Sequence, residues 1–126
     1  MTVAPSCLVE GAERLEAALS ELDLKPEVLE SLDEMGYVDM TPIQEQAIPH
    51  ILAGRDLVGL AETGSGKTSA CGVPLVQLTD SNSTAIQHLV LVPTRELALQ
   101  YVQELDRVGS KTEVVPFAVF GGFDMD

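Results

Sequence analysis

The stretch from Ala61 to Thr68 reads Ala-Glu-Thr-Gly-Ser-Gly-Lys-Thr, and its residue types suit phosphate binding. Gly64 and Gly66 allow the backbone to turn its N–H groups inward, Lys67 can reach β- and γ-phosphates, and the Thr68 hydroxyl can ligate Mg²⁺. The general P-loop pattern G-x-x-x-x-G-K-[ST] has glycine where this chain has Ala61, so the match is incomplete. The alternative is a glycine-rich turn with a solvated lysine.

The elements around this loop are expected to alternate between strands and helices. Apolar runs predict buried strands at 56–60, 88–92 and 113–120, with helices at 67–78 and 95–108 and a surface loop at 81–84. Pro74 should kink or shorten the first of these helices. The alternation predicts an α/β, three-layer fold with a parallel sheet, and ligands beyond the carboxyl ends of its strands.

The first half of the chain predicts helices. Apolar residues spaced by four and three positions indicate an amphipathic helix, which presents Leu8, Ala12, Leu15, Leu19 and Leu22. A second helix is expected over 26–35, ending at Gly36, and a third from Pro42, ending at Gly54.

Composition excludes several classes of protein. The 126 residues are 45% hydrophobic, enough for one domain with a core, and no run approaches the roughly 20 apolar residues of a membrane span. The start lacks a signal pattern, so we expect a cytoplasmic protein with no membrane partner. Two distant cysteines predict neither a disulfide framework nor a zinc site.

The charge is strongly negative. It totals −13, with 12 acids and 3 bases in residues 1–56 and 8 acids and 4 bases in residues 57–126. This argues against a broad electrostatic footprint for nucleic acid. A nucleic-acid partner would have to be held by a few local groups or by parts of a longer protein.

Four motifs in order resemble the first RecA-like domain of a DEAD-box RNA helicase. They are the Q motif (Gly36-Tyr37 with Thr41-Pro42-Ile43-Gln44), motif I (61–68), motif Ia (93–98) and the pair Gly121-Gly122. The resemblance implies an incomplete RecA-like ATP-binding domain over 19–126, with N-terminal helices and a partly helical extension over 1–18.

The resemblance further implies that ATP and Mg²⁺ are the cofactors. Lys67 and Thr68 would be catalytic, Thr68 would hold the metal, and the nucleotide would be bound by Tyr37, Thr41, Gln44, Ala61, Glu62, Thr63, Gly64, Ser65, Gly66, Lys67 and Thr68. The Gln44 amide carries a donor and an acceptor able to pair with adenine N6 and N7. Thr41-x-x-Gln44 is equally a helix capping box, and the sequence leaves both roles open.

By the same resemblance, a second set of residues contacts the RNA backbone. It comprises Pro93, Thr94, Arg95, Glu96, Gly121 and Gly122. Glycines admit close approach of a phosphate, and backbone contacts position a strand without reading its bases. The alternative for Arg95 is an ion pair with Glu96 or Glu62.

Three departures from the family pattern matter. Leu19 stands where the family usually has an aromatic residue that stacks on adenine, and Met40 replaces the common proline before Thr41. The sequence also stops at Asp126, before the family's acidic box and second RecA-like domain. We therefore expect nucleotide binding without appreciable hydrolysis by this chain alone, and RNA unwinding only with the second domain as partner.

Two other outcomes follow from these departures. A chain without the acidic box could be a non-catalytic adenine-nucleotide-binding or protein-interaction module, and a small P-loop kinase is a more remote alternative. Open edges of an incomplete sheet would also favour self-association between copies.

Overall fold

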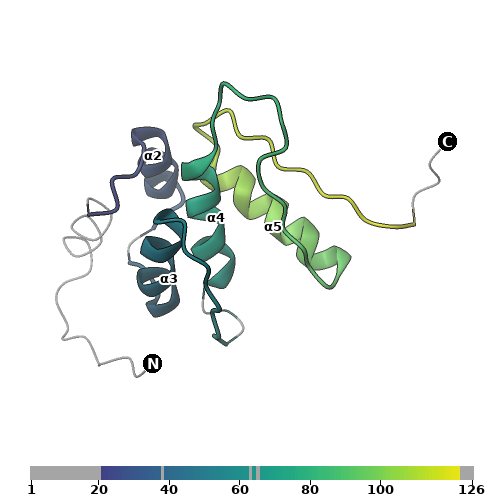
Figure 1. The fold of residues 1–126 in the computed structure, drawn as a ribbon, viewed down its shortest axis with the longest axis horizontal. Helices are drawn as coiled ribbons and strands as arrows, with labels where there is room; N and C mark the ends of the chain where they lie inside the picture. Colours follow the sequence, from purple (N-terminus) through teal and green to yellow (C-terminus); the bar gives the residue numbers. More distant parts are fainter. Residues whose placement is uncertain (1–20, 38, 63, 65, 123–126) are drawn as a thin grey trace.

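Four helices form the framework of the computed structural model, which describes residues 21–37, 39–62, 64 and 66–122 (Figure 1). They are α2 (Pro26–Glu34), α3 (Pro42–Leu52), α4 (Lys67–Leu78) and α5 (Arg95–Val108). Helix α4 lies between α3 and α5 and contacts both, and α2 contacts α4 and α5. The phosphate-loop helix is therefore the centre of the packing.

The predicted helix boundaries are confirmed. Proline occupies the first turn of α2 and of α3, where its missing N–H costs nothing, and Gly36 follows α2 with φ +73°. Helices α4 and α5 match the predicted ranges at both ends. Pro74 was expected to kink or shorten the helix, and it does not shorten it, since α4 continues past the buried Pro74 to Leu78. Packing on neighbouring helices offsets the lost backbone hydrogen bond.

A small apolar core joins all four helices. Its buried members are Leu24, Val28, Leu32, Met40, Ile48, Val73, Val76 and Val108. Val28 and Leu32 lie on one side of α2, as the spacing predicts, and Ala47 and Ile48 are the buried face of α3. Because the core lies between helices, it forms without any sheet.

The prediction of a three-layer α/β fold with a parallel sheet is wrong for the described residues. The segments 56–60, 88–92 and 113–120 are coil, and no backbone–backbone hydrogen bond joins them to another described segment. Val58 and Leu60 are 97% and 98% exposed. A strand needs a neighbour to satisfy its N–H and C=O groups, and apolar alternation does not show that the neighbour is there.

The third of these segments nevertheless keeps a strand-like presentation of its side chains. Val115, Phe117 and Val119 are exposed, whereas the even-numbered residues from 114 to 120 are half-buried. Figure 1 shows this segment leaving the helices as a long coil. Side-chain exposure therefore alternates along residues 114–120 as in a strand, although no backbone hydrogen bonds join these residues to another described segment.

Three expectations for the N-terminal part of the chain lie outside the described residues. They are the helix expected from Leu8, the role of the Leu19 position and the partly helical extension over 1–18. The surface loop at 81–84 is confirmed as an exposed turn, in which the Asn82 N–H donates to Asp80 Oδ1 at 2.9 Å. Among the described helices, none has the length and apolarity needed to cross a membrane.

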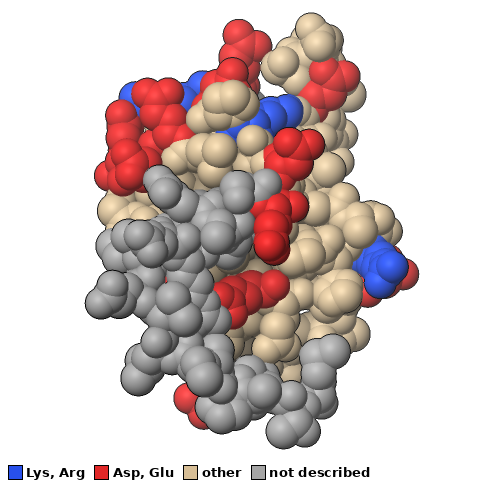
Figure 2. All heavy atoms as spheres, turned by 90° about the vertical axis from the view of Figure 1, so that its left-hand side faces the viewer, with Lys and Arg blue, Asp and Glu red and all other residues tan. Residues whose placement is uncertain are grey.

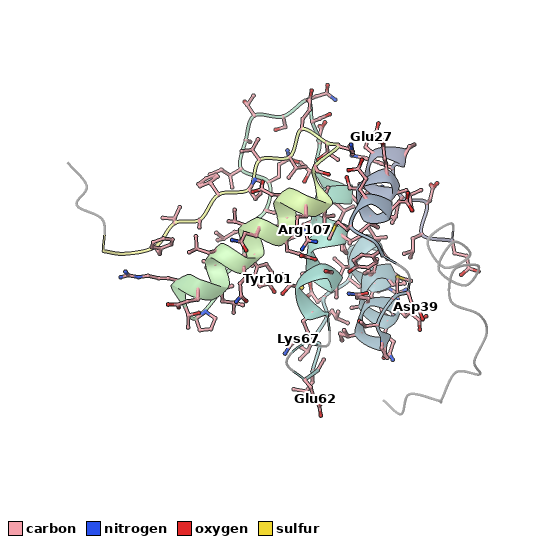
Figure 3. The ribbon with its side chains drawn as sticks, turned by 180° about the vertical axis from the view of Figure 1, so that it is seen from behind. Glu27, Asp39, Glu62, Lys67, Tyr101 and Arg107 are labelled. Atoms are coloured by element: carbon pink, nitrogen blue, oxygen red, sulfur yellow. The ribbon has the colours of Figure 1, made fainter. Side chains whose placement is uncertain are left out.

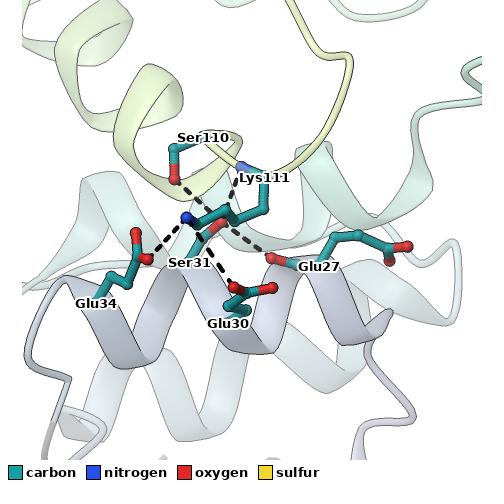
Figure 4. Close-up of polar contacts among 6 residues, drawn as sticks. All are labelled: Glu27, Glu30, Ser31, Glu34, Ser110 and Lys111. Carbon is teal, nitrogen blue, oxygen red and sulfur yellow. Dashed lines mark hydrogen bonds and ion pairs between the residues drawn. The ribbon is translucent and has the colours of Figure 1, made fainter.

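Helix α2 is attached to the end of α5 by a cluster of polar side chains (Figure 4). Ser31, fully buried, donates to the Glu27 carbonyl at 2.9 Å and accepts from Ser110 Oγ and the Lys111 N–H, both at 3.3 Å. The Lys111 ammonium lies 2.7 Å from Glu34, and this hydrogen bond raises the pKa of Lys111. On the face drawn in Figure 2, acidic side chains are more prominent than basic ones.

Candidate nucleotide and RNA-binding site

The loop that precedes α4 brings the candidate phosphate-binding groups together. Gly64 and Gly66 have φ +80° and +91°, and Gly66 is the N-cap of α4. Lys67 Nζ donates to the Ala61 carbonyl at 2.7 Å, which holds the ammonium against the loop. Figure 3 shows Glu62 at the tip of this loop and Lys67 where the loop joins α4. Thr63 and Ser65 lie outside the described residues.

Gln44 directly joins the Q motif to this loop. The side chain is 3% exposed, and its Nε2 donates to the Tyr37 hydroxyl at 2.9 Å and to the Gly66 carbonyl at 3.2 Å. Its Oε1 accepts from the Thr41 N–H at 3.0 Å, so the capping role is present. A Cβ built on Gly66 would lie 2.5 Å from Gln44 Nε2, so only glycine permits this approach.

The Thr41 hydroxyl supplies a test of whether the residues suit an adenine nucleotide. The Thr41 hydroxyl is placed toward the Gln44 backbone as in a capping box. It is nevertheless buried, and its oxygen has no hydrogen-bond partner among the described residues. It would lie 2.9 Å from a Cβ on Gly66, so it faces the point where the phosphate loop joins α4. A buried hydroxyl without a partner is costly, and a ligand group at this junction would satisfy it.

A chain of polar side chains continues from Gln44 toward α5. The Tyr37 hydroxyl interacts with the Ser69 side chain, and Ser69 Oγ donates to Glu104 Oε1. Burial raises the pKa of Tyr37, and the Glu104 charge adds to the rise, whereas Ser69 and Gln44 oppose it. The sequence analysis missed Ser69 and Glu104, because only the packing of α5 against α4 brings residues 35 positions apart together.

Tyr101 of α5 lies close to the proposed metal ligand. Burial raises the pKa of Tyr101, Cys71 contributes in the same direction, and a hydrogen bond with the Thr68 side chain opposes it. An open groove of about 560 Å³ is lined by Thr68, Gln100, Gln103, Glu104, Asp106 and Arg107. The sequence analysis predicted none of these α5 residues, and two acids in the groove disfavour its use for phosphate.

Two of the candidate RNA-contacting residues, Arg95 and Gly122, come together at the N-terminal end of α5. Thr94 caps the helix, its Oγ1 accepting from the Leu97 N–H at 3.2 Å. The Arg95 guanidinium lies 5.7 Å from the Phe120 ring centroid, and a Cβ on Gly122 would be 2.7 Å from its Nη2. Within the described ranges, Arg95 forms no ion pair with Glu62 or Glu96. Motif Ia and the glycine pair are therefore adjacent in space.

Known proteins are similar to this chain in sequence and in structure. Residues 41–126 match the DEAD/DEAH box helicase family, which is more than half of the chain. The chain belongs to this family. It is 42% identical over 106 residues to the DEAD-box ATP-dependent RNA helicase CshA of Bacillus cereus, covering 84% of this chain and 20% of the relative. It is 45% identical over 108 residues to the ATP-dependent rRNA helicase RRP3 of Debaryomyces hansenii, covering 86% and 23%.

Two solved structures resemble this chain over most of its length. The RNA helicase Prp28 of Chaetomium thermophilum bound to ADP has a TM-score of 0.72 at 35% identity, covering 83% of this chain and 27% of that one. Dbp5 of S. cerevisiae bound to RNA and ADP BeF3 has a TM-score of 0.72 at 30% identity, covering 75% and 25%. The DEAD-box chain described here thus spans about a fifth of the length of its curated relatives.

Proposed function

We propose that the chain is the ATP-binding part of an ATP-dependent RNA helicase that remodels or unwinds RNA duplexes. Tyr37, Thr41 and Gln44 bind the adenine side, and the loop 61–68 binds the phosphates, with Lys67 on the β- and γ-phosphates. The Thr68 hydroxyl would hold Mg²⁺, which would supply neutralisation of the phosphate charge.

The observation that carries this proposal is the contact between Gln44 and Gly66 at 3.2 Å. An amide able to read a base and a loop able to cradle phosphates are joined directly, although 22 positions separate them in the sequence. The unpartnered Thr41 hydroxyl at the same junction supports a ligand there.

The proximity of Arg95 to Gly122 supports the RNA-binding half of the proposal. A guanidinium beside a glycine turn offers a cation and close backbone approach for one phosphate. The acidic surface elsewhere (Figure 2) means that such contacts must be local. In the whole protein, a second RecA-like domain would complete the RNA path, and hydrolysis would need its further acidic and catalytic groups.

Titration calorimetry of the whole chain tests nucleotide binding. We expect ADP to bind with and without Mg²⁺, GDP to bind far more weakly, and Lys67→Ala to abolish binding. Lys111→Ala is the matched control, since it removes a lysine remote from the loop. Equal binding of ADP and GDP, or full binding by Lys67→Ala, would refute the assignment.

A second candidate function, a protein-interaction module, is favoured by the exposed apolar segments. Val58, Leu60, Leu89, Leu91 and Val119 are each more than four-fifths exposed. Such side chains favour association, and we propose that copies of the chain pair through them. Light scattering over rising concentration should show dimers, and Val58→Lys with Val119→Lys should reduce them. A monomer at all concentrations would exclude this function.

A further inference from the structure

Phe120 lies beside Arg95, yet the proposed function gives it no role. The Arg95 guanidinium is 5.7 Å from the centroid of the Phe120 ring, within the range of a cation–π attraction. The same guanidinium lies against Gly122, where a Cβ would approach Nη2 to 2.7 Å and Nη1 to 3.1 Å. An aromatic ring and a bare glycine backbone therefore both lie against one cation.

The segment after α5 returns along the helix and brings Phe120 to its first residue (Figure 1). A tight turn reverses the chain, with the Thr112 N–H and hydroxyl donating to the Gly109 carbonyl at 2.8 and 2.7 Å. Val114 then packs against the core beside the end of α5. The 14 residues of α5 are about 21 Å long, and the extended chain from Val114 to Phe120 covers about 20 Å. A return of this length ends at Arg95.

The alternation of exposure along this segment selects Phe120 rather than its neighbours. Successive side chains of an extended chain point to opposite sides, so Phe120 shares the side of Val114, which packs on the core. Both are half-buried, whereas Phe117 and Val119 are 65% and 83% exposed. A shift of one residue would place Val119 at Arg95 and remove the ring. The register of the segment therefore determines what holds the guanidinium.

The ring leaves the hydrogen-bonding capacity of Arg95 intact. A cation–π attraction acts on the charge of the guanidinium and needs none of its five N–H donors. Within the described ranges, the guanidinium forms no ion pair, so no carboxylate neutralises its charge. A freely moving arginine loses rotamer freedom when it binds an anion, and one that a ring already holds loses less.

We propose that Phe120 is a positioning residue for RNA binding, whose ring holds the Arg95 guanidinium beside the Gly122 turn before a backbone phosphate binds there. The inference rests on the proposed RNA contact of Arg95 and extends it to the residue that places this side chain. Affinity for a phosphate backbone then depends on an aromatic side chain that carries neither charge nor a hydrogen-bonding group.

Fluorescence anisotropy with a labelled oligouridylate tests the inference on the whole chain. Phe120→Leu should weaken binding about two- to fivefold, the measure of one cation–π contact at an exposed site. Phe120→Tyr keeps the ring and should bind as the wild type does. Phe117→Leu, the same change on the opposite side of the segment, should leave the affinity unchanged. Losses of equal size in Phe120→Leu and Phe117→Leu would overturn the inference.

Salt dependence and a double variant separate positioning from a direct contact of Phe120 with RNA. In Phe120→Leu, Arg95 still reaches the phosphate, so the slope of log affinity against log salt should equal that of the wild type. Arg95→Gln should make this slope shallower by about 0.7. Phe120→Leu should have no further effect in the Arg95→Gln background. An undiminished effect there would overturn the inference, because Phe120 would then act on RNA without Arg95.

The side-chain proton resonances of Arg95 supply a readout that needs no RNA. Ring currents of Phe120 should displace them from the positions shown by the exposed Arg55, and Phe120→Leu, but not Phe117→Leu, should remove the displacement. Undisplaced resonances in the wild type would contradict the inference. If Arg95→Gln binds RNA with wild-type affinity and slope, the proposed RNA contact fails and the inference fails with it. If Arg95→Gln weakens binding and Phe120→Leu does not, only the inference fails.

Discussion

Replacing Gly66 by alanine should break the junction between Gln44 and the phosphate loop. The backbone has φ +91° at this position, and an added Cβ would lie 2.5 Å from Gln44 Nε2 and 2.9 Å from Thr41 Oγ1. The left-handed conformation alone costs an alanine about 1–2 kcal/mol. The contact also displaces a buried amide from its hydrogen bonds, which adds about 1–3 kcal/mol.

Gly54→Ala separates these two contributions. Gly54 has φ +74°, and nothing lies within 4 Å of a Cβ built on it, so its substitution carries the backbone cost alone. Urea unfolding of the whole chain should therefore show Gly66→Ala to be less stable than Gly54→Ala by about 1–3 kcal/mol. ADP binding should be lost only in Gly66→Ala. Equal losses of stability in the two variants would refute the contact between Gly66 and Gln44.

Three further predictions concern other parts of the chain. Ser31→Ala should lower the free energy of unfolding in urea by about 0.5–1.5 kcal/mol, because it removes a fully buried hydroxyl that donates to the Glu27 carbonyl and accepts from the Lys111 N–H. Ser81→Ala, in the exposed turn, should leave the free energy of unfolding unchanged. Burial raises the pKa of Tyr37 above 10.0, so Tyr37 ionises at lower pH in the unfolded chain and the free energy of unfolding should fall as the pH rises past 10. Phenolate absorbance and urea midpoints measured over this pH range should show a smaller fall in Tyr37→Phe. An unchanged fall would contradict the burial of the Tyr37 hydroxyl. Arg95→Gln should weaken RNA binding and make the slope of log affinity against log salt shallower by about 0.7, whereas Arg55→Gln, exposed and outside the motifs, should leave the slope unchanged.

The helices could be predicted because their signals are local. A helix satisfies its own backbone hydrogen bonds, so the starts at Pro26 and Pro42 and the stop at Gly36 act within a few residues of the structure they set. The capping role of Gln44 is local in the same way, and the structure retains it. The adenine-binding role of Gln44 was predicted only from the resemblance to the helicase family. Its contact with Gly66 depends on α3 packing against α4, which no local pattern contains.

The predicted strands are absent from the described residues because a strand needs backbone hydrogen bonds from a second segment. Val115, Phe117 and Val119 alternate with half-buried neighbours as a strand would, yet the described residues offer their backbone no partner. Alternation thus shows which face of a segment is apolar, and not whether another segment covers it. Glu104 shows the same limit of local sequence patterns at the candidate site. A lone acid on an amphipathic helix looks like solvated surface, and only the packing of α5 on α4 makes Glu104 the acceptor for the buried Ser69 hydroxyl.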